Sequence, residues 1–223
     1  MDDLLRDRVE AALKKTDNQY VEIHIEEASS SGIRYRGKDL EEIGRSSAIG
    51  GNVRALAGGG WGFSSFNNIS DLEAKIEQAI QQAKVIGGER IDLAEVPSVV
   101  DYVPPSIGQD PSSLTLADKK NVLDEYAEIM MRNPGIQSSS IGYSDSRRRM
   151  VFANSEGSYI DQERVDVNMR INAQARNGSD VQQYGISLGS LGDFQFVMNL
   201  QDEAEEVAEK AVALLNAPEV NGG

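Results

Sequence analysis

The sequence predicts an α+β fold in which helices cover one face of antiparallel sheets. Two segments, Tyr20–Glu27 and Val165–Arg176, alternate strictly between apolar and polar residues, as half-buried strands do. Two glycine-containing turns, Gly58–Gly60 and Asn177-Gly178, follow predicted strands and indicate hairpins. Apolar residues at helical spacing precede and follow the strands in both halves of the chain, so the same order of elements occurs twice.

The first half is expected to run helix, strands, helix. Residues 2–15 carry one apolar stripe, with acidic residues first and lysines last, as the helix dipole favours. Ser70 and Glu73 have the spacing of a capping box, and the helix after them is expected to end at Gly87-Gly88. Besides Tyr20–Glu27, the predicted strands of this half are Ile33–Arg36, Leu40–Arg45, Ala48–Ala57 and Trp61–Phe66.

The second half repeats this order after a proline-rich stretch. Proline fixes φ and removes a backbone donor, so residues 89–113 are expected to form an extended connector. Thr115 is expected to cap the next helix, and the last helix is expected at about 201–216. The predicted strands are Ser138–Tyr143, Arg148–Ala153, Tyr159–Glu163, Val165–Arg176 and Val181–Leu188.

These elements predict a division of the chain. A first α+β unit is expected at 1–88, the connector at 89–113, a second α+β unit at 114–217, and the start of a linker at 218–223. The shared order of helix, strands and helix is consistent with a duplicated unit. Residue identity between the halves is low, so the order of elements alone supports the duplication.

The composition narrows the classes of function. The net charge is −14, so a nucleic-acid or membrane partner is not expected, because phosphate groups attract Lys and Arg. The chain contains no Cys, which excludes disulfides and thiolate metal ligands. Its N-terminus reads as a helix without the apolar run of a signal peptide, so a cytoplasmic protein is expected.

No motif in the chain carries recognisable chemistry. His24 shares a strand face with Glu22 and Glu26 and could offer three metal ligands, but a solvated polar face is the favoured interpretation. The run Gly58–Gly62 lacks the Lys and Ser/Thr of a phosphate-binding loop. Arg147–Arg149 is interpreted as a charged strand edge that prevents unwanted pairing, or else as a contact for an acidic partner. We therefore assign no catalytic, cofactor-binding or metal-binding residue.

With these elements placed, four passages carry a resemblance to a known family. They are YVEIHIEEASSSGIRYRGKDLEEIGRS, GGNVRALAGGGWGFSSF, YSDSRRRMVFANSEGSYIDQE and the helix end ALLNAP. Together they span nearly the whole chain, which resembles the N-terminal domain of the TldD/PmbA family. Members of this family were once described as modulators of DNA gyrase and are now regarded as zinc metallopeptidases.

The resemblance implies that the chemistry lies outside this chain. The family binds zinc through a His-Glu-x-x-x-His motif and a later Cys, all in a C-terminal domain. Neither the motif nor a Cys nor a second His is present here, and the chain stops at Asn221–Gly223, where the resemblance expects that domain to begin. A truncated protein, a proteolytic remnant and a split or degenerate gene product are all consistent with this. Zinc is expected only in the missing domain, and the 223 residues alone are expected to be inactive.

The resemblance also implies a role. Both α+β units would belong to one non-catalytic N-terminal domain, which helps to form a substrate passage and a dimer in a peptidase of extended polypeptides. The dimer partner would be an identical chain or a paralogue. Arg54, Trp61 and Phe63 are candidates for a functional surface, and the alternative places both rings in the core and Arg54 as a strand-face charge. The alternative function is a free-standing module that binds an extended peptide or a partner by strand addition.

Overall fold

The α+β class is confirmed by a computed structural model that describes residues 3–16 and 19–218. Within these ranges the helices are α1 (Asp3–Leu13), α2 (Leu72–Ile86), α3 (Leu116–Met130) and α4 (Gln201–Leu214). The strands are β1 (Tyr20–Arg36), β2 (Asp39–Ala57), β3 (Gly60–Phe66), β4 (Val100–Val103), β5 (Ile136–Asn154), β6 (Tyr159–Asn177) and β7 (Asp180–Leu191). Short 3₁₀ helices lie at Ile69–Asp71, Pro111–Ser113 and Phe194–Val197. No helix in the described ranges is long and apolar enough to cross a membrane.

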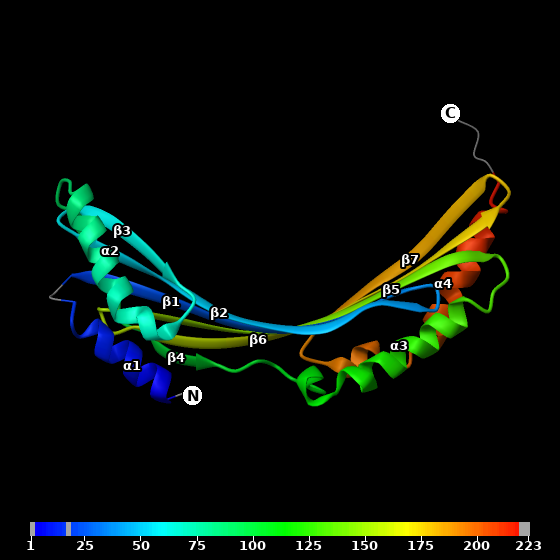
Figure 1. Ribbon diagram of the computed structural model, residues 1–223, viewed down its shortest axis with the longest axis horizontal. Coiled ribbons are helices and arrows are strands. Elements are labelled where there is room, and N and C mark those ends of the chain that lie inside the picture. Colours follow the sequence, from blue (N-terminus) through cyan, green and yellow to red (C-terminus); the bar gives the residue numbers. More distant parts are fainter. Residues whose placement is uncertain (1–2, 17–18, 219–223) are drawn as a thin grey trace. The chain divides into compact units, whose positions relative to one another are not determined.

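The strands form one sheet in the order β3-β2-β1-β5-β6-β4, and β7 also pairs with β6. The pairs β2–β3 and β6–β7 are antiparallel, as predicted. The series α1-β1-β2-β3-α2 and α3-β5-β6-β7-α4 repeat one order of elements along the chain (Figure 1). One pair was not predicted: β4 lies within the expected connector and runs parallel to β6.

The predicted strands are shorter than the observed ones. The expected break between Tyr20–Glu27 and Ile33–Arg36 does not exist, because β1 continues through both. The same correction applies to β2, β5 and β6, each of which was predicted as two separate strands. The serine-rich and charged stretches that suggested breaks are compatible with extended backbone, since their side chains find partners. Ser31 of β1, for example, is buried and donates a hydrogen bond to Asp145 of β5.

The residues pack into two compact units, each made of several segments. Unit 1 comprises Met1–Ser29, Ser47–Pro105 and Arg148–Arg164; unit 2 comprises Ser30–Ser46, Ser106–Arg147 and Val165–Gly223. Both units contain segments from the two halves of the sequence, because the long strands each contribute residues to both. The domain bounds 1–88, 89–113 and 114–217 stay a prediction, and all but the first residue of the predicted linker 218–223 lies outside the described residues.

Unit 1 buries one face of its strands beneath α1 and α2. The shared apolar cluster comprises Leu5, Val9, Ala12, Leu13, Val21, Ile23, Ile25, Val53, Ala55, Phe66, Leu72, Ile76, Ala79, Val151, Ala153 and Tyr159. The predicted capping box of Ser70 and Glu73 is wrong. Asn68 instead accepts a hydrogen bond from the backbone N–H of Ser70, and Glu73 pairs with Lys15 at 2.9 Å.

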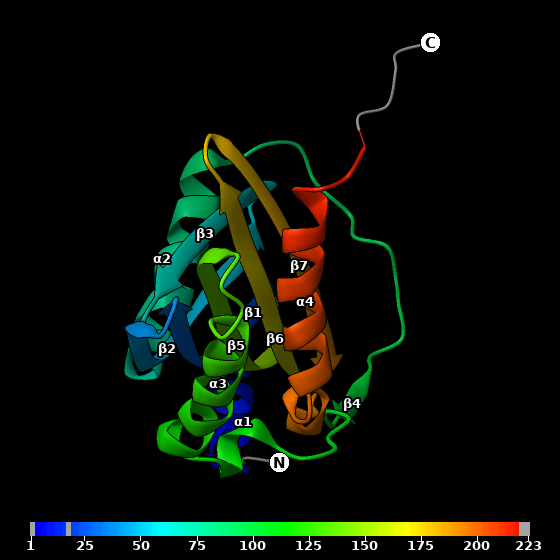
Figure 2. The same ribbon diagram turned by 90° about the vertical axis from the view of Figure 1, so that its right-hand side faces the viewer.

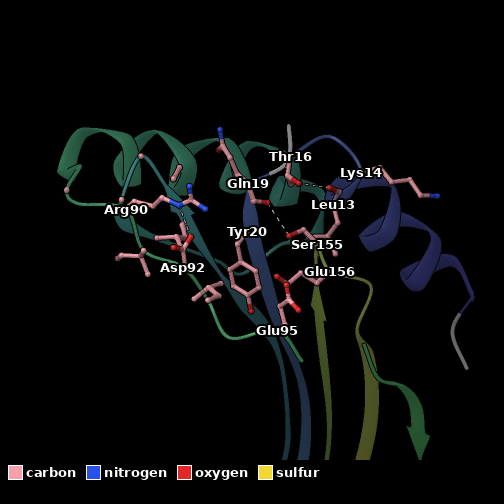
Figure 3. A pocket seen from close by; sticks show the side chains of 17 residues that line it. Leu13, Lys14, Thr16, Gln19, Tyr20, Arg90, Asp92, Glu95, Ser155 and Glu156 are labelled. Carbon is pink, nitrogen blue, oxygen red and sulfur yellow. Dashed lines mark hydrogen bonds and ion pairs between the residues drawn. The ribbon is translucent and has the colours of Figure 1, made fainter. Parts of the chain in front are cut away.

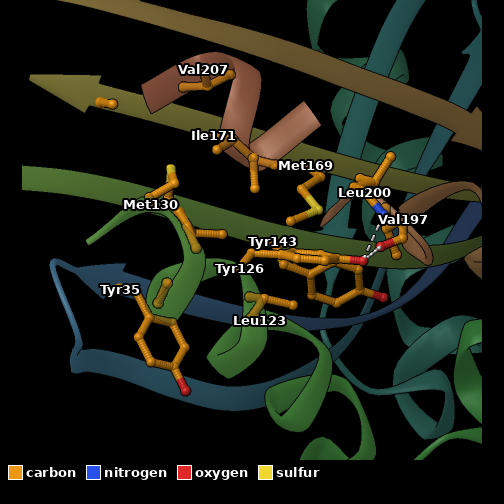
Figure 4. Close-up of a cluster of buried hydrophobic side chains, with 14 of the residues drawn as sticks. Tyr35, Leu123, Tyr126, Met130, Tyr143, Met169, Ile171, Val197, Leu200 and Val207 are labelled. Atoms are coloured by element: carbon orange, nitrogen blue, oxygen red, sulfur yellow. Dashed lines mark hydrogen bonds between the residues drawn. The ribbon is translucent and has the colours of Figure 1, made fainter. Parts of the chain in front are cut away.

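Unit 2 buries its strands beneath α3 and α4 (Figure 4). Tyr126 of α3 is fully buried, donates its hydroxyl proton to the carbonyl of Val197 at 2.9 Å and accepts from the N–H of Leu200 at 3.1 Å. The predicted cap at Thr115 is confirmed, and Asp118 completes a capping box with it. In the described ranges, the helices of each unit pack on this one face of its strands, and no helix covers the opposite face.

Candidate functional site

The three candidate residues Arg54, Trp61 and Phe63 lie on the β2–β3 hairpin of unit 1. In the register of this pair, Arg54 is opposite Phe63 and Leu56 is opposite Trp61. Neither ring belongs to the apolar core cluster, and Phe63 is 53% exposed. The alternative that placed both rings in the core is therefore wrong for Phe63.

Two glycines determine which way the rings point. Side chains alternate along a strand, so Gly60 and Gly62 face α2 while Trp61 and Phe63 face the other side. A Cβ atom at Gly62 would lie 1.9 Å from the carbonyl oxygen of Ala79, a distance no side chain can occupy. The helix therefore approaches the strand closely only because glycine is present. This packing holds the aromatic residues on the helix-free face of unit 1.

Arg54 connects several side chains on this face. Its Nη1 lies 2.9 Å from Oε1 of Glu22, and its guanidinium carbon lies 4.6 Å from the ring centroid of Trp61. Tyr20 packs edge-on against Trp61, with centroids 6.0 Å apart, and donates its hydroxyl proton to Glu22 Oε2 at 2.8 Å. Burial and the hydrogen bond to Glu22 raise the pKa of Tyr20 to about 12. We call Tyr20, Glu22, Arg54 and Trp61 the Arg54 cluster.

A groove of about 520 Å³ lies on the same face, and Phe63 lines it. Its other aromatic walls are Phe152 and His24, whose ring centroids are 4.9 Å apart. Met150 adds an apolar surface, and Gln162 adds a side-chain amide. No Ser, Lys or carboxylate in this groove is arranged as a nucleophile with a base. The groove can hold apolar side chains of a ligand, but it has no groups for covalent chemistry.

A second hollow of unit 1 has a volume of about 1060 Å³ (Figure 3). Tyr20, Arg90, Asp92, Ser155 and Glu156 are among the side chains that line it. The Ser155 hydroxyl is already used in the turn, because it donates to the Gln19 carbonyl and accepts from the Val21 N–H. Arg90 pairs with Asp92 at 2.7 Å. The described residues that line this hollow therefore offer polar groups but no activated nucleophile.

The metal interpretation of His24 does not fit its surroundings. Glu22 pairs with Arg54, and Glu26 pairs with Arg148 at 3.1 Å. Within the described residues, no group of three or more His, Cys, Asp or Glu side chains is placed to hold a metal ion. The polar-face interpretation is right for the half-exposed His24 side chain and wrong for Glu22, which is buried.

The arginine cluster was predicted as a strand edge, and this is wrong. Arg147–Arg149 lie on β5, between β1 and β6 in the strand order, so they are not on an edge. Arg147 pairs with Asp110 at 2.7 Å. Arg149 forms two hydrogen bonds, of 3.0 and 2.7 Å, with the fully buried Asp161. Arg147 and Arg149 therefore take part in half-buried and buried ion pairs within the fold.

A buried polar cluster in unit 2 was not predicted. Lys119 of α3, 1% exposed, lies 2.5 Å from Asp145 of β5 and donates to Ser31 of β1 at 2.9 Å. Tyr143 donates to the same Asp145 oxygen at 2.6 Å. Ser and Lys also occur together in Ser–Lys catalytic sites, but here all four residues of the cluster are buried. The sequence contained one sign of this cluster. Asp145 follows Ile141 and Tyr143 at two-residue spacing, so it lies on the apolar face of the strand, where a charged residue needs a buried partner.

Comparison with known proteins covers most of the chain. Residues 21–85 match domain 1, and residues 109–217 match the central domain, of the PmbA/TldA metallopeptidases. The chain is 33% identical over 205 residues to a metalloprotease of Synechocystis, covering 91% of this chain and 44% of that protein. It is 29% identical over 218 residues to a metalloprotease of Methanocaldococcus jannaschii, covering 95% and 47%. The chain thus spans less than half the length of these relatives.

Solved structures share the fold at low sequence identity. A Thermotoga maritima protein, named as a modulator of a DNA gyrase, superposes with a TM-score of 0.77 at 17% identity and covers 100% of this chain and 50% of its own. TldE of Thermococcus kodakarensis superposes with a TM-score of 0.66 at 14% identity, covering 95% and 47%. From the matched domains and these similarities, the chain belongs to the PmbA/TldD metallopeptidase family.

Proposed function

We propose that this chain is the non-catalytic, substrate-contacting part of a zinc metallopeptidase that hydrolyses extended polypeptides in the cytoplasm. It helps to form the substrate passage and the dimer, with an identical chain or a paralogue as partner, and a C-terminal domain supplies the zinc. The matched family domains support the peptidase class. The absence of a metal-ligand cluster among the described residues is consistent with chemistry located elsewhere.

The observation that carries the proposal is the alternation on β3. Gly60 and Gly62 receive α2, and this leaves Trp61 and Phe63 on a face that no helix covers. The face combines exposed aromatic surface, a groove of about 520 Å³ and the Arg54 cluster. Aromatic rings and an arginine in this arrangement suit an extended, sequence-variable polypeptide, because they contact backbone and apolar side chains alike.

The single tryptophan of the chain allows a direct test, because Trp61 lies in the proposed site. Addition of an unfolded, carboxymethylated polypeptide is expected to change Trp61 fluorescence saturably. Phe63→Ala is expected to weaken this binding by about tenfold, which corresponds to ~1.4 kcal/mol. Phe196→Ala is the matched control, since Phe196 is also exposed, at 42%, and lies in unit 2. Equal affinities of the wild type and Phe63→Ala would contradict the proposed contact surface.

The catalytic half of the proposal has its own test. The gene is expected to encode a His-Glu-x-x-x-His motif downstream of residue 223, and a stop codon there would refute the peptidase assignment for this chain. The purified 223 residues are expected to bind no stoichiometric zinc by elemental analysis and to cleave no peptide. Tight zinc binding lost in His24→Ala would show that the interpretation of His24 is wrong.

A further inference from the structure

Strand β7 has an unusual composition for the edge of a sheet. Between Val181 and Leu191 it contains no charged residue and no proline, and it pairs with β6 along its whole length. Natural sheets usually protect such edges with charges, proline or bulges, because an unpaired edge can recruit another strand. β6 is its sole strand partner in the described chain, and α4 covers one of its faces (Figure 2).

The direction of the backbone groups of β7 follows from its hairpin. A two-residue loop, with Gly178 at φ 58°, makes Asn177 and Asp180 the closing hydrogen-bonded pair. Even-numbered residues of β7 then bond to β6, and Gly192 continues this pattern by donating to Val165 at 2.9 Å. The odd-numbered residues from Val181 to Leu191 therefore direct their N–H and C=O groups to the free edge.

Two other edges of the sheet carry protecting groups. In unit 2, the Asp39–Ser46 part of β2 carries Glu41 and Glu42, which pair with Arg36 and Arg34 of β1. In unit 1, the backbone N–H of Phe63 on β3 is already bonded to the side-chain oxygen of Gln82 at 3.2 Å. By contrast, β7 presents an uncharged row of free backbone groups.

The side chains of β7 are complementary to themselves. If two copies pair antiparallel about Ile186, the exposed Val181 lies opposite Leu191 of the second copy, at both ends of the pair. Tyr184 then lies opposite Leu188, and Ile186 lies opposite Ile186; these residues already pack at the margin of the unit 2 core. The register places odd residues opposite odd residues, as the free backbone groups require. No charged side chain of either strand meets another.

From these observations we propose that the free edge of β7 is a self-association site, where two copies form a continuous sheet by antiparallel pairing about Ile186. The occupant is a second copy of this chain, because in this register each large apolar side chain of β7 lies opposite another apolar side chain and the remaining pairs are uncharged. The inference shares with the proposed function only the expectation of a dimer and does not depend on peptide binding. Each chain carries a charge of −14, so added salt is expected to strengthen the association by screening repulsion.

A single-cysteine experiment tests the register, because the chain contains no Cys. At the twofold axis, residues 186 form a non-hydrogen-bonded pair with Cα atoms about 4.5 Å apart, a separation that a disulfide spans. Ile186→Cys is therefore expected to give a disulfide-linked dimer under mild oxidation. Gln183→Cys is the matched control, since two copies of residue 183 lie roughly 20 Å apart in this register. Equal cross-linking of both variants would overturn the proposed pairing.

Sedimentation equilibrium of the 223-residue chain tests the association itself. The wild type is expected to dimerise, and Gln183→Lys is expected to weaken the dimer by about tenfold, because it introduces a desolvated charge at the edge. Gln81→Lys on exposed α2 changes the net charge equally and is expected to leave the dimer intact. A monomeric wild type, including one that instead binds a synthetic extended peptide at β7, would overturn the proposal. Peptide binding followed by Trp61 fluorescence remains a separate readout for the proposed function.

Discussion

Lys119 Nζ lies 2.5 Å from Asp145 Oδ2 in unit 2, and both residues are buried. This pair joins α3 to β5, and Ser31 and Tyr143 complete the coordination of the two charges. Burial, together with the hydrogen bond to Asp145, raises the pKa of Tyr143. The cluster is thus a fully partnered group of charges in an otherwise apolar region.

Removing one member of this pair is expected to be costly. Lys119→Met leaves Asp145 buried without its counter-charge, and such changes destabilise proteins by about 3–5 kcal/mol. The free energy of unfolding in urea measures the effect. The double variant Lys119→Met/Asp145→Leu is expected to recover much of the loss, because no unpaired charge remains. This account would be contradicted if the double variant lost more unfolding free energy than the two single variants lose in total.

The pair Arg149–Asp161 is expected to play the same role in unit 1. Asp161 is fully buried, and the hydrogen bond to it raises the pKa of Arg149. Asp161→Ala is expected to destabilise by about 3–5 kcal/mol, since it removes the buried counter-charge that accepts two hydrogen bonds from Arg149. Hydrogen exchange locates the effect, with protection expected to fall first at unit 1 amides. Uniform protection equal to that of the wild type would refute the structural role.

The close approach at Gly62 predicts a sharp contrast between two glycines. Gly62→Ala places Cβ against the Ala79 carbonyl and must displace α2, at a cost of about 3 kcal/mol or more. Gly44→Ala is the matched control, because no atom lies within 4 Å of its added Cβ. Gly44→Ala is expected to change the midpoint of urea unfolding little. Similar losses for both variants would exclude the packing explanation.

Stability is expected to fall at high pH. Burial, with the hydrogen bond from its hydroxyl to Asp124, raises the pKa of Tyr35 to about 12. Below pH 10 the phenol is neutral in both folded and unfolded states, so its contribution is fully present there. Between pH 10 and 12 the unfolded state ionises first, and the contribution is lost. Tyr35→Phe should therefore show a smaller loss of unfolding free energy across this window, as measured by urea titrations at each pH.

Alternation along the strands was enough to predict the fold class, but not the lengths of the strands. The odd-numbered residues of β5, including Asp145 and Arg149, stay buried or half-buried through the polar stretch that had suggested a break. Charged residues at core positions look like the end of a strand when their partners are unknown. Their partners, Lys119 and Asp161, are distant in sequence, so local pattern cannot identify them.

The candidate site was predicted only in part. The sequence identified Arg54, Trp61 and Phe63, yet it could not decide which face of β3 is covered, because glycines and aromatics are both compatible with a core. The position of α2 over Gly60 and Gly62 decides this. The groove beside Phe63 also depends on Phe152 from β5, a neighbour that no local pattern indicates.

Along four residues of β3, positions that pack against α2 alternate with positions that face the proposed ligand surface. Gly60 and Gly62 pack against the helix, whereas Trp61 and Phe63 lie outside the apolar core cluster. Exchanges at 61 and 63 can therefore alter which ligands this surface prefers while the hairpin stays folded. A library randomised at these two positions alone is therefore expected to diversify recognition without redesign of the scaffold.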